Sequence, residues 1–378
     1  MNARLVLWLL VYVALAALSL RGRVWAVVLY LLSSLIAPHR WWWGTAVIGL
    51  PLMDLSVAIL ASAVILHRRR EIDVLPAVDP VMTGLSLLTV INLTAVTCWA
   101  VSFDLSLVHA VQKMKLLLTF NLLIAGICSE RDLKTVLLSL MVMISLLSVE
   151  SYLTHTKGGR LERFAVSGVA GSNQIGSFWV SLIPLYLGLF LERGRLIKLG
   201  TLAALPFTLN LVLRTASRGA FLGLGTGLAS LFVISNRQTR KYLLIAGVLL
   251  SGMFFYLLRD PELIERFLGI QGAAEVDVSA QSRLAFWKVG MLAIQDHPAG
   301  LGGECWDKFV SVEYLAAAGL SEVSRSVHQA FLSEALAWGC QGLALLLCLQ
   351  FVSLLRAYRS SRLYSQLSDS HSSVRVTC

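Results

Sequence analysis

Six arginines and one histidine stand near the ends of apolar segments and have the chemistry needed to hold a phosphate group. A guanidinium presents paired donors that match phosphate oxygens. An imidazole can move a proton near neutral pH. If the fold brings these side chains together, they predict a site for an anionic, phosphate-bearing lipid. The seven residues are Arg160, Arg163, Arg214, Arg218, Arg266, Arg283 and His328.

Each of these residues also has a simpler interpretation. A long cationic side chain at a membrane boundary can bind lipid headgroups or pair with a loop carboxylate. A histidine at the start of a helix, such as His328, is more often structural than catalytic. Only the seven residues taken together favour a phosphate-binding site. Whether they form one depends on the elements that position them. The available carboxylates are Glu150, Glu162, Asp260, Glu262 and Glu265.

The composition predicts that these elements are membrane helices. Of the 378 residues, 57% are hydrophobic and 14% charged, whereas soluble domains are about 45–50% apolar and about 25% charged. A membrane-spanning helix needs about 20 apolar residues. We therefore predict an all-α, polytopic integral membrane protein with about 11 transmembrane helices, which excludes a soluble enzyme or a secreted domain. The apolar segments are 5–20, 24–37, 46–66, 81–100, 105–127, 133–150, 175–191, 197–213, 219–235, 241–258 and 329–355.

The distribution of Lys and Arg predicts how the spans are oriented. One set of alternate short connections carries 13 of these residues, and the other set carries three. Cytoplasmic loops are the Lys- and Arg-rich ones, so we place the first set and the C-terminus in the cytoplasm and the N-terminus outside. All seven candidate residues then lie at the outer face.

The longest outer segment, residues 259–328, is predicted to contain an amphipathic helix over 282–295 that ends before Pro298. Glu334 lies six residues after His328, so on an ideal helix the two side chains point about 120° apart. A direct pair or a shared metal is therefore not expected, and the cysteine spacing predicts no metal site either. The apolar stripe of the predicted helix is Leu284, Trp287, Met291 and Ile294.

Three further charges fall inside predicted spans. Asp54 lies in the third span and Lys113 and Lys115 in the fifth, where charges are costly unless they pair or line a cavity. They are either mutual partners that fix helix packing or part of an ion path. The second interpretation favours a non-catalytic transporter of an anionic substrate.

Four patches occur in order along the chain. Together they resemble the O-antigen ligase and polymerase superfamily of bacterial envelope glycosyltransferases. This chain has Gln329 where that family usually has Asn, and Ala337 where an acidic residue is frequent. The patches are Arg214-Thr215-Ala216-Ser217-Arg218-Gly219-Ala220; Arg283 and Trp287 with Asp296-His297-Pro298-Ala299-Gly300-Leu301-Gly302; His328-Gln329-Ala330-Phe331-Leu332; and Gly339 with Gly342.

The resemblance implies a metal-independent membrane transferase without a cofactor. Such an enzyme takes a glycan from an undecaprenyl-diphosphate carrier and joins it to an acceptor hydroxyl at the periplasmic face of the bacterial inner membrane. His328 would be the general base or would orient the acceptor hydroxyl. Four arginines would hold the diphosphate, and three other residues would support the site. The first group is Arg218, Arg283, Arg163 and Arg214, and the second is Arg160, Arg266 and Glu334.

The resemblance also implies how the chain is divided. Residues 1–150 would be N-terminal transmembrane helices, 151–355 the catalytic region with its periplasmic loop 259–328, and 356–378 a disordered cytoplasmic tail. We expect an O-antigen ligase that acts on lipid A-core. A polymerase of O-antigen or exopolysaccharide and the transporter are the alternatives, and no nucleic-acid partner is expected.

Overall fold

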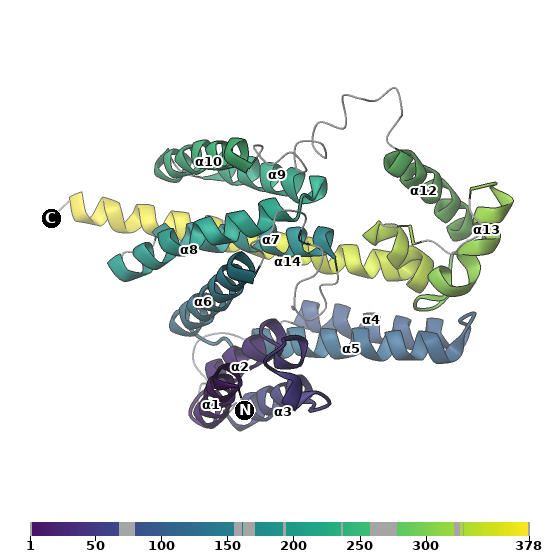
Figure 1. Ribbon diagram of the computed structural model, residues 1–378, viewed down its shortest axis with the longest axis horizontal. Coiled ribbons are helices and arrows are strands. Elements are labelled where there is room, and N and C mark those ends of the chain that lie inside the picture. The colour runs from purple at the N-terminus through teal and green to yellow at the C-terminus, as the bar shows by residue number, and fades with distance from the viewer. Residues whose placement is uncertain are drawn as a thin grey trace. The chain divides into compact units, whose positions relative to one another are not determined.

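A computed structural model shows the fold (Figure 1). It describes residues 2–67, 80–154, 161, 171–191, 194–235, 237–257, 278–320, 326–327 and 329–376. Within these ranges the chain is helical and has no strand, which confirms the predicted all-α class. The principal helices are α1 (Ala3–Ser19), α2 (Arg23–Leu35), α3 (Leu52–Leu66), α4 (Pro80–Cys98), α5 (Phe103–Ala125), α6 (Glu130–Thr154), α7 (Ser172–Leu191), α8 (Arg195–Arg214), α9 (Arg218–Ile234), α10 (Arg237–Leu257), α12 (Val278–Asp296), α13 (Ser311–Ala317) and α14 (Ala330–Val376).

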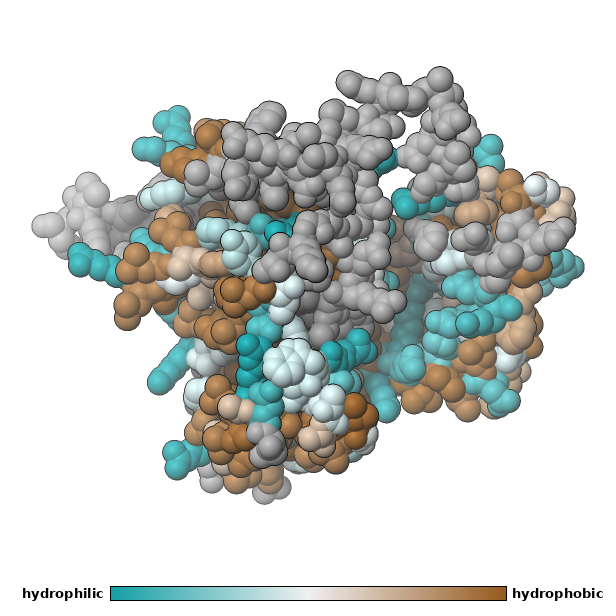
Figure 2. Space-filling view, viewed as in Figure 1, coloured by the Kyte–Doolittle hydropathy of each residue, from teal (hydrophilic) through white to brown (hydrophobic). Residues whose placement is uncertain are grey.

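Every predicted apolar segment coincides with a helix, and many helices expose large apolar side chains. Figure 2 shows apolar residues on the surface. Leu87 and Ile91 of α4 and Leu116 of α5 are exposed large apolar residues. Within the described ranges, five helices are long and apolar enough to cross a membrane: α4, α5, α6, α8 and Ala330–Arg356 of α14. The chain is thus a membrane protein with several spans, and the count of about 11 stays a prediction.

The chain divides into two compact units. Unit 1 comprises Met1–Leu75 and Ala125–Ala273, and unit 2 comprises Pro76–Ile124 and Ala274–Cys378. Unit 2 therefore combines α4 and α5 with the C-terminal third of the chain. The functional division at residues 150 and 355 stays a prediction, because compactness reports packing and not activity.

Polar contacts join the helices of unit 1 within an apolar core. The Trp179 indole of α7 donates to Ser148 Oγ of α6 at 3.0 Å, and Thr208 Oγ1 of α8 donates to the Tyr186 hydroxyl at 2.9 Å. Small hydroxyl side chains make such contacts between membrane helices because they let the backbones approach closely. These bonds, together with the buried Leu211, fix α6, α7 and α8 to one another.

Arg23 is a packing residue and not a loop residue. It is 5% exposed, and its guanidinium donates to His67 O at 2.6 Å, Ala125 O at 3.3 Å and Cys128 Sγ at 3.1 Å. The start of α2 is thereby tied to the ends of α3 and α5 and to the segment before α6. Arg23 is one of the 13 Lys and Arg residues that predicted the cytoplasmic connections. The structure gives its guanidinium a specific set of acceptors.

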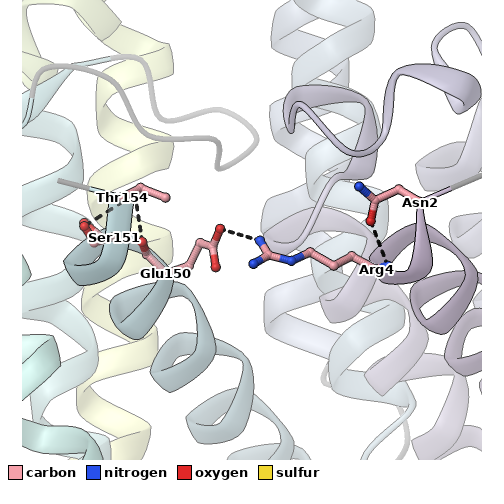
Figure 3. Close-up of polar contacts among 5 residues, drawn as sticks. All are labelled: Asn2, Arg4, Glu150, Ser151 and Thr154. Carbon is pink, nitrogen blue, oxygen red and sulfur yellow. Dashed lines mark hydrogen bonds and ion pairs between the residues drawn. The ribbon is translucent and has the colours of Figure 1, made fainter. Parts of the chain in front are cut away.

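An ion pair joins the start of α1 to the end of α6. Arg4 Nη1 lies 2.8 Å from Glu150 Oε1, and Asn2 caps α1 by accepting from the Arg4 amide (Figure 3). Glu150 is one of the carboxylates that the sequence offered to the outer-loop arginines. In the structure Glu150 pairs with Arg4.

In unit 2, α12 confirms the predicted helix but buries a different face. It ends at Asp296, before Pro298 as expected. Leu284 and Met291 are more than half exposed, whereas Val289 and Ala293 are buried against the rest of the unit. The predicted apolar stripe was wrong at Leu284 and Met291. It was based on the large apolar residues, whereas the residues that pack closely are the smaller Val289 and Ala293.

The helix α14 extends through the segment that the sequence predicted as a disordered tail. It continues from Arg356 to Val376. No Gly or Pro follows Gly342, so nothing in the backbone ends the helix. The segment from residue 356 therefore has helical structure, and its cytoplasmic location stays a prediction.

Candidate functional site

The centre of unit 2 is a break in α14 at Gly339. Its backbone angles, φ 78° and ψ 174°, lie in a region essentially reserved for glycine. The break frees backbone groups on both sides, and the loop after α12 binds them. Leu301 N donates to Leu336 O at 2.8 Å, Gly302 N to Ala337 O at 2.9 Å, and Cys340 N to Pro298 O at 2.9 Å. The patch Asp296–Gly302 and the patch at Gly339 thus form one interlocked structure.

The close approach of the two backbones requires glycine at Gly300 as well. Gly300 has φ 95°, and a Cβ placed on it would lie 2.5 Å from Gly339 N. A side chain at either position would separate the loop from the helix. The close packing of the two backbones therefore explains why positions 300 and 339 are both glycine.

Replacement of Gly339 by alanine is expected to destabilise unit 2. The added Cβ would lie 2.5 Å from Ala299 O, and the positive φ alone costs about 1–3 kcal/mol. We expect the apparent melting temperature in detergent to fall by about 2–12 °C. Gly225→Ala in α9 is the matched control, because nothing lies within 4 Å of its added methyl group. Equal melting temperatures for both variants would show that the break is not required.

Residues of α4 and α5 and of the turn between them bind the loop and the helix break at Gly339. The sequence did not predict these contacts. Asn92 Nδ2 of α4 donates to Trp338 O at 3.1 Å, one residue before the break. Ser106 Oγ of α5 accepts from Gly303 N at 3.1 Å, and Val101 N donates to Leu301 O at 2.9 Å. In the sequence, the signal for these contacts was a polar residue inside each apolar segment, Asn92 and Ser106.

His328 lies outside the described residues, but both of its neighbours are held in place. Val327 is buried, and its carbonyl accepts from the Trp287 indole of α12 at 2.8 Å. On the other side, Gln329 Oε1 accepts from the Leu332 amide and caps the first turn of α14. Gln329 therefore acts as the helix N-cap, a position at which asparagine is among the best residues.

The cap predicts the effect of changes at Gln329. Loss of a side-chain N-cap costs about 0.5–2 kcal/mol, so Gln329→Ala should fray the first turn of α14 and lower any activity that depends on His328. Gln329→Asn should keep the cap and most of that activity. Gln350→Ala, an exposed change later in α14, is the control. Equal activity of the Ala and Asn variants would argue against the cap.

Arg283 lies in the same unit as the segment that carries His328. It is exposed on α12, one helical turn before Trp287. Residues four apart share a helix face. Since Trp287 binds the carbonyl of Val327, Arg283 lies on the face of α12 that holds the start of the 326–329 segment. A cluster of Arg283 with His328 stays a prediction.

Within unit 1, Arg214 and Arg218 lie on either side of the turn between α8 and α9. Arg214 ends α8, and Arg218 is the exposed first residue of α9, where Ser217 caps the helix by accepting from Ala220 N at 3.3 Å. The amide of Leu161 donates to Arg214 O at 2.9 Å. This bond fixes one point of the segment that carries Arg160 and Arg163, and these two residues and Arg266 lie outside the described ranges.

Residues 201–347 match the family model described as O-Antigen ligase. This region of the chain is therefore similar to the O-antigen ligase family. Comparison with curated proteins gives no match. The O-antigen ligase region runs from α8 into α14 and includes the Arg214–Arg218 turn, Arg283 and the break at Gly339. The resemblance that the sequence indicated is confirmed.

Unit 2 also contains a polar cavity that helix α5, outside the O-antigen ligase match, helps to form. The cavity has a volume of about 360 Å³ and lies among α5, the 303–307 segment and the first two turns of α14. The Lys113 ammonium binds both carboxylate oxygens of Glu334 and lies 5.5 Å from the centre of the Trp338 ring. His109 Nε2 lies 3.3 Å from Glu304 Oε2.

This cavity corrects two interpretations of the charged residues. Lys113 has Glu334 as its ion-pair partner, so it does not need the proposed pairing with Asp54. Asp54 lies in the first turn of α3, where a carboxylate is favourable, and not in the middle of a span. Glu334 belongs to the Lys113 pair. Among the residues that the structure describes, no group of three or more His, Cys, Asp or Glu is placed to hold a metal.

Two groups between α12 and α14 have raised pKa values. Burial, and then the hydrogen bond that Tyr314 donates to Asp296 Oδ2 at 2.7 Å, raise the pKa of Tyr314 to about 12. Burial also raises the pKa of the Cys305 thiol. Both groups therefore stay neutral at physiological pH, and they position the loop but are poor candidates for a base or a nucleophile.

Proposed function

We propose that the chain is a membrane glycosyltransferase that moves a glycan from an undecaprenyl-diphosphate carrier to an acceptor hydroxyl at the periplasmic face of the inner membrane. The acceptor in this proposal is lipid A-core, which makes the enzyme an O-antigen ligase. The observation that carries the proposal is that the O-antigen ligase region includes both motifs interlocked at Gly339, next to the segment that presents His328.

The proposed reaction is a single displacement at the anomeric carbon. His328 takes the proton of the acceptor hydroxyl as its oxygen bonds to the anomeric carbon. The bond from that carbon to the diphosphate oxygen breaks, and undecaprenyl diphosphate leaves. Arg283 and Arg218, with Arg163 and Arg214, hold the diphosphate and stabilise the charge that it gains. Arg160 and Arg266 support them, and no divalent metal takes part.

Contacts between helix ends support the predicted alternation of the spans. Arg23 joins three ends that the charge distribution placed in the cytoplasm. Arg4 and Glu150 are both at ends placed outside, as are Leu161 and Arg214. Every one of these contacts joins ends assigned to the same side, as required if the helices cross the membrane alternately.

A reconstituted reaction tests the proposal. The purified protein in vesicles is given a lipid-linked glycan donor and either lipid A-core or a second donor-linked glycan as acceptor, with and without a chelator. We expect one block to be transferred to lipid A-core and no effect of the chelator. A ladder of products on the carrier would identify a polymerase instead.

The transporter remains a separate alternative with its own outcome. It requires Asp54, Lys113 and Lys115 to form a path, whereas the Lys113 ammonium is bound to Glu334. Uptake of an anionic glycan into vesicles that fails in Asp54→Asn, with no glycan transfer by the unaltered protein, would favour the transporter.

A further inference from the structure

The polar cavity of unit 2 has the chemistry of a carbohydrate site. Hydrogen-bond acceptors and donors lie side by side in its wall, which suits a sugar because each hydroxyl both donates and accepts. The volume of about 360 Å³ is at the small end of the range for ligand pockets, about 300–1,000 Å³. The acceptors are Glu304, Asp307 and Glu334, and the donors include Gln112 and Lys113.

One donor in the cavity wall is unused. Trp306 is 4% exposed, and its indole N–H has no hydrogen-bond partner among the residues that the structure describes. A buried donor without a partner costs about 1–3 kcal/mol. The nitrogen itself is buried, so a ligand hydroxyl would supply the missing acceptor only after the wall rearranges.

The backbone at Glu304 is held in an unfavourable conformation beside the cavity. Glu304 has φ 54°, a value that non-glycine residues rarely adopt. The carboxylate is directed to His109 across the cavity, at 3.3 Å. Such strain is typical of residues whose position serves a binding site.

The balance of charge among the described lining residues disfavours a phosphate in this cavity. Of these residues, three are carboxylates, one is a lysine and one is a histidine, and the lysine is bound to Glu334. Like charges repel strongly in a partly buried site. A diphosphate therefore belongs with the arginines, and the cavity favours a neutral or amine-bearing sugar.

We propose that this cavity is the subsite for the terminal sugar of the acceptor, a neutral or amine-bearing and not a phosphorylated residue. The assignment of this sugar to the acceptor rests on the proposed function, whereas the presence of a sugar site does not. Ala330, Ser333 and Glu334 of α14 line the cavity within two turns of His328. The cavity therefore lies at the start of the helix that follows the proposed base in the chain.

Direct binding to the purified protein tests the subsite without any reaction. The probes are glucose, glucosamine and glucose 6-phosphate, and binding is followed by saturation-transfer NMR. We expect glucose and glucosamine to bind and glucose 6-phosphate to bind at least tenfold more weakly. Asp307→Asn should weaken glucosamine binding about tenfold, because a hydrogen bond to a charged group is lost. Preferential binding of glucose 6-phosphate would overturn the proposal.

A second variant blocks the cavity without removing a carboxylate. Ser333 is exposed at its rim, so Ser333→Trp should fill the space and abolish binding of all three sugars. Glu313→Gln on the exposed side of α13 is the matched control and should leave binding unchanged. Unchanged binding in both Asp307→Asn and Ser333→Trp would place the sugars elsewhere and overturn the subsite.

The same variants separate this inference from the proposed function. If the reconstituted protein transfers no glycan yet binds glucosamine in a manner sensitive to Ser333→Trp, the subsite stands and the transferase proposal fails. If transfer proceeds with an unchanged KM for the acceptor in both variants, the transferase stands and the subsite is overturned.

Discussion

Replacement of His328 by alanine is expected to lower the rate of glycan transfer by about 10²–10⁴-fold, the usual contribution of a general base. An acceptor hydroxyl is a weak nucleophile until its proton is removed, and His328 is the residue assigned to that step. In the proposed mechanism the diphosphate is held by arginines and not by the imidazole. Donor binding and the amount of folded protein should therefore stay close to those of the unaltered enzyme.

The decisive measurement is the transfer rate in vesicles at saturating donor, together with donor binding to the same preparation. His39→Ala is the matched control, because His39 is exposed in the short turn Pro38–Arg40 of unit 1 and has no assigned role. Full activity of the His328 variant would remove the proposed base. Loss of donor binding in parallel with the rate would instead indicate a structural residue.

The helices could be predicted from the sequence because the information is local. Apolar segments and their charged or Gly- and Pro-containing boundaries gave the position of every principal helix up to α10, and Pro298 gave the end of α12. A continuous apolar run gives no sign of an internal break, however. The break at Gly339 exists because the distant loop at Pro298–Gly302 binds the freed backbone groups.

The candidate site was predictable in its residue types and only partly in its partners. The pairing of Lys113 with Glu334 joins residues 221 positions apart, and no spacing rule connects them. The expected angle of about 120° between Glu334 and His328 stays a prediction, because His328 lies outside the described residues. Sequence patterns could not identify Asn92, Ser106 or the cavity residue Glu304, because their roles arise from packing between α4, α5 and the loop.

The donor site makes the second large prediction. Loss of Arg283 or Arg218 should raise the KM for the lipid-linked donor by about 10–150-fold, because a charge-assisted bond to phosphate contributes about 1.5–3 kcal/mol. Arg283→Lys should fall between Arg283→Ala and the unaltered enzyme, since lysine keeps the charge but loses the paired donors. The kcat for transfer should change less than the KM if both arginines mainly bind the donor.

Arg237→Ala provides the comparison that separates donor binding from a general loss of positive charge. Arg237 is the exposed first residue of α10, as Arg218 is of α9, but the charge distribution places it at the cytoplasmic side. Its replacement should leave the donor KM unchanged. If the Arg283 and Arg218 variants behave like Arg237→Ala, these arginines bind lipid headgroups and the diphosphate must be held by other groups. If only one of them raises the KM, the donor is held within the unit that carries that arginine.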